Sequence, residues 1–132
     1  MEFCVGARGK TKKYIEFLLP SLISQLKLEN SKKLLYIKVD KELEHTGETV
    51  PMFGIDTILV VLRPTRDKVA LGITLAHEMT HVAQLAKGTL QLTPKGKKWK
   101  GKFYRASYPY LASPWEIQAF EKQEILFRRA ID

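Results

Sequence analysis

Two histidines and a glutamate lie close together in the segment LAHEMTHVAQ, residues 75–84. His77 and His81 are four residues apart, so on an α-helix their imidazoles would lie one above the other and could reach the same metal ion. Glu78 adds a carboxylate that could take a proton from a water molecule acidified by that ion. The H-E-x-x-H pattern therefore predicts a zinc-binding helix with Glu78 as general base.

The simplest alternative is a helix whose two histidines face solvent without a metal. That alternative does not explain why the polar side of an otherwise apolar helix is so restricted in composition. This side consists of Thr74, His77, Glu78, His81 and Gln84. The pattern favours a metal site.

A catalytic zinc ion usually has three protein ligands, and two histidines with one glutamate form an established set. Glu116 is the main candidate for the third ligand, because its helical face looks core-facing and its carboxylate would need a cation there. That face also carries Ala119, Phe120, Gln123 and Phe127. Ser113-x-x-Glu116 also has capping-box spacing, which leaves a purely structural role open. His45, in a polar stretch upstream, is a further candidate ligand.

The elements that must position these residues can be read from the periodicity of apolar side chains. We expect a single α+β domain over residues 1–132. The pattern predicts an N-terminal helix over 14–28 with a kink or break at Pro20, followed by strands over 34–39 and 57–62 with a loop or hairpin connection over 41–51. It then predicts a helix over 66–87 ending at Gly88 and an irregular stretch over 89–112. A last helix is expected to begin at Ser113, with Pro114 in its first position.

The composition restricts the class of protein. One cysteine, Cys4, excludes an internal disulfide and a cysteine-rich zinc cluster. No apolar run approaches the length needed to cross a membrane. The N-terminus lacks the apolar region of a secretory signal. We therefore expect a cytoplasmic protein, in the host cytoplasm if the chain is viral.

The net charge of +8 raises the question of a nucleic-acid partner. Basic residues interleaved with Trp99, Phe103 and Tyr104 could follow a phosphate backbone while the aromatic rings stack on bases. The basic residues of this segment, called the basic loop below, are Lys95, Lys97, Lys98, Lys100, Lys102 and Arg105. The alternative is a set of solvated lysines that keep the protein soluble.

Two further motifs accompany HEMTH. PWExxA spans residues 114–119, and W-x-G-x-x-Y spans residues 99–104. Together they resemble the gluzincin class of zinc metallopeptidases, most closely the small phage-encoded metallopeptidases and the SprT-like zincins. The resemblance covers residues 57–120, roughly half of the chain. It implies a minimal zincin-like domain in which a small, mainly antiparallel sheet packs on an N-terminal helix, the HExxH helix and a C-terminal glutamate helix.

The resemblance implies that His77, His81 and Glu116 bind Zn²⁺ and that Glu78 is the base for peptide hydrolysis. It also implies that strand 57–62 is the edge along which a peptide substrate adds. Ala119 would let the two site helices approach each other closely. Tyr104 and Tyr108 are the leading candidates for stabilising the oxyanion, ahead of Tyr110.

Two departures accompany this resemblance. Larger gluzincins carry an aspartate where this chain has Phe120, so the partner of a zinc histidine must come from Thr74, Gln84 or a backbone carbonyl. SprT-like proteins typically supply a histidine as third ligand, and none follows His81. The alternative function is a zincin-like binding module with a structural metal, recruited to nucleic acid by the basic loop.

Overall fold

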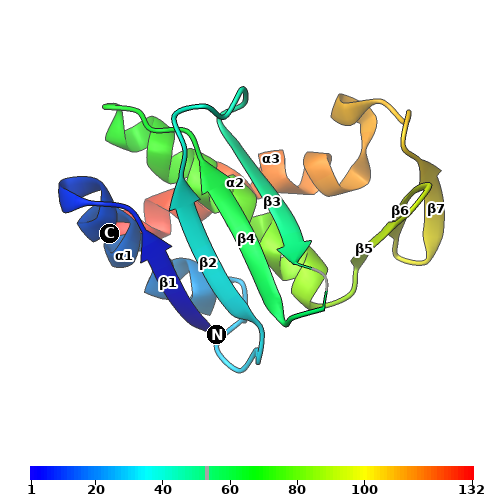
Figure 1. Ribbon diagram of the computed structural model, residues 1–132, viewed down its shortest axis with the longest axis horizontal. Helices are drawn as coiled ribbons and strands as arrows, with labels where there is room; N and C mark the ends of the chain where they lie inside the picture. The colour runs from blue at the N-terminus through cyan, green and yellow to red at the C-terminus, as the bar shows by residue number, and fades with distance from the viewer. Residues whose placement is uncertain (53) are drawn as a thin grey trace.

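The computed structural model describes residues 1–52 and 54–132, which form an α+β domain with two small sheets and three α-helices (Figure 1). In chain order the elements are β1 (Glu2–Gly6), α1 (Gly9–Gln25), β2 (Leu34–Val39), β3 (Gly47–Met52), β4 (Thr57–Leu62), α2 (Lys68–Ala86), β5 (Leu90–Thr93), β6 (Gly96–Trp99), β7 (Lys102–Arg105), a 3₁₀ turn η1 (Tyr110–Ala112) and α3 (Pro114–Ile131). None of the helices in these residues is long and apolar enough to span a membrane.

The larger sheet has the strand order β1-β2-β4-β3. Its β1–β2 and β2–β4 pairs are parallel, and only β3–β4 is antiparallel. The expectation of a mainly antiparallel sheet is therefore wrong for this sheet. One parallel pair involves β1, a short strand that the sequence pattern did not reveal and that is connected to β2 by the long crossover α1. The other pair joins β2 to β4, and β3 lies in the connection between them.

The edge of this sheet nearest the histidine helix is β3, not β4. Strand β4 (TILVVL) pairs with β2 on one side and β3 on the other, so the expectation that it forms the edge is wrong. Its nearly unbroken apolar sequence suits an interior strand that is paired on both sides. Strand β3 (GETVPM) lies in the segment expected to be a loop or hairpin connection, and its polar residues and Pro51 suit an edge.

The helices lie together on one face of this sheet (Figure 1). Helix α1 runs without a break through Pro20 and begins five residues earlier than expected. Helix α2 begins after Asp67, whose carboxylate accepts a hydrogen bond from the Ala70 amide at 3.1 Å. It ends before Gly88, whose φ of +76° favours glycine, as expected for a C-terminal cap.

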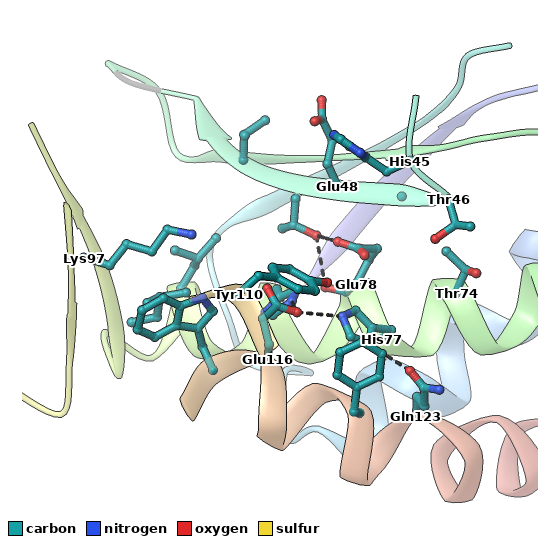
Figure 2. A pocket seen from close by; sticks show the side chains of 18 of the residues that line it. His45, Thr46, Glu48, Thr74, His77, Glu78, Lys97, Tyr110, Glu116 and Gln123 are labelled. Carbon is teal, nitrogen blue, oxygen red and sulfur yellow. Dashed lines mark hydrogen bonds and ion pairs between the residues drawn. The ribbon is translucent and has the colours of Figure 1, made fainter. Parts of the chain in front are cut away.

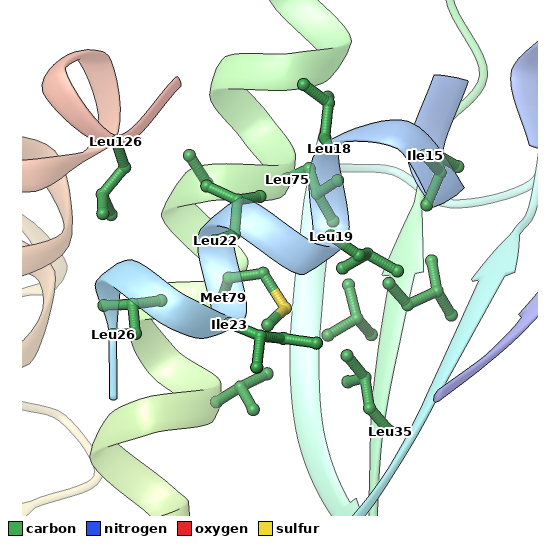
Figure 3. Packing of buried hydrophobic residues seen from close by; sticks show 14 of the residues in the cluster. Ile15, Leu18, Leu19, Leu22, Ile23, Leu26, Leu35, Leu75, Met79 and Leu126 are labelled. Carbon is green, nitrogen blue, oxygen red and sulfur yellow. The ribbon is translucent and has the colours of Figure 1, made fainter. Parts of the chain in front are cut away.

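The hydrophobic core fills the space between the sheet and the helices (Figure 3). Its most buried members include Leu18 and Leu22 of α1 and Leu75 and Met79 of α2. Because the opposite side of α2 carries the polar stripe, this packing turns that stripe toward β3 and α3. The core thereby decides which way His77 points.

The second sheet, β5-β6-β7, is an antiparallel meander in the stretch expected to be irregular. It lies beside the main body of the domain, at the end of α2 (Figure 1). A small cluster of Leu90, Trp99 and Trp115 joins this meander to the start of α3.

Candidate metal centre and groove

Helix α2 brings His77, Glu78 and His81 to one buried location, each with 7% or less of its surface exposed. Glu116, in the first turn of α3, meets them from the opposite side. One of its carboxylate oxygens, Oε1, lies 2.9 Å from His77 Nε2 and 3.0 Å from His81 Nε2. These three side chains form a cluster whose ligand atoms all lie within 4.8 Å of one another, and it could hold a metal ion.

The start of α3 explains the direction of Glu116. Ser113 occupies the N-cap position and Pro114 follows it, as expected. The Ser113 hydroxyl, however, donates to the Pro109 carbonyl at 2.9 Å and does not cap the helix. The Glu116 carboxylate is turned to α2, where it contacts the two histidines, so the geometry is not that of a capping box.

Side-chain amides hold the outer nitrogens of both histidines. His81 Nδ1 lies 2.8 Å from Gln84 Oε1, and His77 Nδ1 lies 2.8 Å from Gln123 Oε1. The Gln84 amide nitrogen donates to the Trp115 carbonyl and to Gln118, which fixes the oxygen of Gln84 toward the ring. His81 Nδ1 must therefore donate, and in the neutral ring Nε2 carries a lone pair.

This arrangement calls for a cation. A neutral imidazole would direct the lone pair of Nε2 at the Glu116 carboxylate, and two acceptors repel each other. Either a proton on the ring or a metal ion between the three atoms removes the conflict. Adjacent ligand atoms of a tetrahedral zinc ion are about 3.3 Å apart, because the bonds are about 2.0–2.1 Å long. The observed separations from Glu116 Oε1, 2.9 Å and 3.0 Å, are shorter than that value and are hydrogen-bond distances.

The pKa shifts follow from the same contacts. Burial acts to raise the pKa of Glu116, but its hydrogen bonds with His77 and His81 outweigh burial and lower the pKa to about 2. Burial acts to lower the pKa of His77, and the hydrogen bonds with Glu116 and Gln123 outweigh it, so this pKa is raised. The cluster thus favours an ionised carboxylate next to positive charge.

Glu78 lies beside the cluster and is held by the edge strand. Thr49 Oγ1 of β3 donates to Glu78 Oε1 at 2.7 Å. Burial raises the pKa of Glu78, while the Thr49 hydrogen bond and the two histidines oppose that shift. A Cβ on Gly47 would lie 3.0 Å from Glu78 Cγ, so glycine allows β3 to approach the base this closely.

A groove of about 840 Å³ runs past these residues (Figure 2). Its walls come from β3, α2, the β5–β6 hairpin, η1 and the first turns of α3. The groove is lined by His77, Glu78, His81 and Glu116 together with Thr49, Thr74, Tyr110, Phe120 and Gln123 among others. The candidate metal cluster and Glu78 are therefore open to a ligand from one side.

The tyrosines are distributed differently from what we expected. Tyr104 stacks edge-on against Tyr108 and Trp115, and neither Tyr104 nor Tyr108 lines the groove. Tyr110, ranked behind them on the sequence, does line it. Partial burial, with the neighbouring Glu116 carboxylate, raises the pKa of Tyr110 to about 12. No local signal separated three tyrosines in a segment without visible periodicity.

His45 lies at the rim of the groove, exposed in the loop before β3. Within the described residues, the group of potential ligands around His77 does not include it. Thr74 lines the groove but does not hold a histidine ring. The partners of the histidine Nδ1 atoms are Gln84, which was one of the expected candidates, and Gln123. Gln123 was expected only to share a helical face with Glu116. Thr49 was missed because its strand was interpreted as a connection.

The basic loop is divided between two faces of the meander. Lys97 pairs across the strands with Tyr104, and Trp99 with Lys102, so these side chains share the face toward Trp115. Lys98 and Arg105 alternate to the other face, and Lys95 and Lys100 lie in turns.

Comparison of the chain with protein-family profiles, with curated proteins and with solved structures found no match.

Proposed function

We propose that this chain is a zinc-dependent metallopeptidase in which His77, His81 and Glu116 hold the metal. The observation that carries the proposal is the pairing of both Nδ1 atoms with amide oxygens while both Nε2 atoms face one carboxylate oxygen. Histidine that binds metal is typically oriented in this way by a partner on its other nitrogen. Two imidazoles and a carboxylate are a zinc set, and zinc bound there would acidify a water molecule and polarise a peptide carbonyl.

Glu78 acts as the general base. Its carboxylate borders the groove and is kept in place by Thr49. Burial raises the pKa of Glu78, so the group accepts the proton of the attacking water and can return it to the departing amine nitrogen. A carboxylate of unperturbed pKa would be a weaker base for this transfer.

Strand β3 supports the backbone of the substrate. It forms the edge of the sheet, and it lines the groove through Gly47, Glu48, Thr49 and Val50. An extended peptide can pair with the free side of such an edge strand. This pairing would bring the carbonyl groups of the peptide next to Glu78.

Tyr110 is the best-placed oxyanion donor of the three tyrosines. A phenol with a pKa of about 12 stays protonated at neutral pH and can donate to the negative oxygen that develops during hydrolysis. It lines the groove together with Glu78 and Glu116, and Figure 2 shows its ring beside them, which suits that role.

Replacement of the base provides the decisive test. Glu78→Gln should keep about one zinc ion per chain, measured by elemental analysis, and should lose peptide hydrolysis by a factor of about 10²–10⁴, because an amide cannot take the proton. Glu121→Gln, an exposed position on α3, is the matched control. Equal hydrolysis by Glu78→Gln would exclude this residue as base.

Metal content separates the remaining alternatives. If the wild type binds no zinc, the metallopeptidase proposal fails. If it binds zinc tightly, yet hydrolyses none of the peptides in a diverse library, the metal is structural and the chain is a binding module.

A further inference from the structure

One end of the groove combines an apolar wall with a single ammonium group. Leu85 at the end of α2, Leu90 and Leu92 of β5, and Trp115 form the wall. Lys97 of β6 extends into this end from the meander (Figure 2). Its Nζ lies 5.1 Å from the centroid of the Trp115 ring, a distance at which the ring face attracts a cation.

The Lys97 ammonium has no carboxylate partner in the described residues. The ion pairs found there join Lys33 to Asp56 and the histidines to Glu116. Lys97 is half-buried, so it has lost part of its hydration without gaining a counter-ion. A half-buried cation of this kind gains from an anionic ligand, because the charge-assisted contact replaces lost water.

The orientation of Lys97 distinguishes it from the other basic residues of the segment. Strand alternation sends Lys98 to the opposite face, where it is exposed. Outside the candidate metal cluster, the acidic and imidazole groups that line the groove are Glu78 of α2 and, from the β3 side, Glu48 and His45. The groove therefore has a cationic end at the meander.

From this geometry we infer that the Lys97 end of the groove is a subsite for a carboxylate of the substrate. The inference rests on the proposed peptidase function and names its substrate class, peptides that carry a carboxylate near the scissile bond. Leu85, Leu90 and Trp115 would contact the aliphatic part of the ligand while Lys97 pairs with its charge. Two sources of that carboxylate share this chemistry, a glutamate side chain and the free C-terminus of a peptide.

The first experiment measures cleavage of matched peptides by zinc-loaded enzyme. Glutamate or glutamine is placed in turn at each of the two positions before and after the scissile bond, and each peptide is made with a free or an amidated C-terminus. We expect kcat/KM to be about 10- to 100-fold higher for the carboxylate at one position, the range of a charge-assisted hydrogen bond. Preference for glutamate identifies a side-chain subsite, and preference for the free acid identifies terminal recognition.

Variants of Lys97 connect the preference to this residue. Lys97→Met keeps the aliphatic stem over Trp115 and removes the charge, so it should abolish the preference for each carboxylate peptide over its matched uncharged peptide. Lys97→Glu should reverse the preference in favour of lysine-containing peptides. Lys98→Met, on the opposite face of the same strand, should behave as wild type. A preference that survives in Lys97→Met overturns the inference.

A binding measurement keeps the inference testable without hydrolysis. Fluorescently labelled glutamate and glutamine peptides are titrated into zinc-loaded Glu78→Gln, with and without Lys97→Met. Tighter binding of the carboxylate peptide that depends on Lys97 supports the subsite even if the wild type hydrolyses nothing, in which case only the peptidase proposal fails. Hydrolysis or binding without any difference between the matched peptides refutes the subsite and leaves the peptidase proposal intact.

Discussion

Neutral amides hold the outer nitrogens of both candidate ligand histidines. Phe120 packs edge-on against His77 with ring centroids 4.6 Å apart. Gln123, three residues further along α3, reaches His77 Nδ1 from the same helix. A neutral partner makes the imidazole a less basic ligand than a carboxylate would. We expect the metal of this site to be held less tightly than in a carboxylate-supported site.

The identity of the third ligand is testable at single residues. Glu116→Ala removes the oxygen on which both Nε2 atoms converge, so zinc affinity should fall by more than the roughly 10- to 100-fold loss that follows removal of an outer partner. His45→Ala, at the exposed rim, should leave zinc affinity unchanged within about twofold. Competition with a chelating indicator measures both. Retained zinc in Glu116→Ala with loss in His45→Ala would reverse the assignment.

At the scale of elements, the site depends on how closely α2 and α3 approach each other. Ala119 of α3 is completely buried. Gly72 of α2 faces the ring of Phe127 of α3, and a Cβ at Gly72 would overlap that ring. The candidate metal cluster has two residues on α2 and one on α3, so the distance between His77 and Glu116 depends on how closely these helices approach each other.

Replacing Gly72 tests this contact by the sign of its effect. In an exposed helix, glycine to alanine would stabilise by about 1 kcal/mol. Here we expect Gly72→Ala to destabilise the fold by about 1–3 kcal/mol, because the added methyl group overpacks a buried ring. Urea unfolding of the metal-free protein gives the free energy. Phe127→Leu combined with Gly72→Ala should recover part of the lost free energy of unfolding. If Gly72→Ala stabilised the fold, the helices would have space for the added methyl group and the overpacking argument would be wrong.

At the scale of the whole molecule, the net charge is +8, and the basic residues of the meander lie on two opposite faces. These two faces cannot both contact one partner. The alternation of β6 and β7 sends Lys98 and Arg105 away from the groove and Lys97 toward it. A phosphate backbone that lies along the outer face of the meander could contact Lys98 and Arg105 but not Lys97. We therefore propose that any nucleic-acid binding is weak, electrostatic and separate from the groove.

Salt dependence of DNA binding tests this division. Each lost phosphate contact lowers the slope of log affinity against log salt by about 0.9. The double variant Lys98→Gln, Arg105→Gln should therefore flatten the slope by about 1.8, whereas Lys97→Gln should leave it unchanged. Fluorescence anisotropy over a salt series provides the measurement. Absence of wild-type binding at low salt would leave these residues as a solvated surface, and an equal effect of Lys97→Gln would contradict the division.

The local pattern of the sequence determined the elements that carry the metal cluster. Strands 34–39 and 57–62 have the predicted bounds, and the histidine helix lies within one or two residues of its predicted ends. Helix periodicity and caps are properties of neighbouring residues, so they can be read without the fold. For the same reason the inward direction of Glu116 followed from its apolar neighbours on one helical face.

Only the tertiary structure decided what surrounds that cluster. The pairing of β1 with β2, the place of β3 at the edge, and the contacts of Thr49, Tyr110 and Gln123 all join residues far apart in the sequence. Strand order depends on which backbone groups form hydrogen bonds across the domain. Short strands such as β1 and β5 have too few residues to show a clear alternation of apolar and polar side chains. The direction of Lys97 likewise depends on the register of β6, which cross-strand pairing sets and local composition does not.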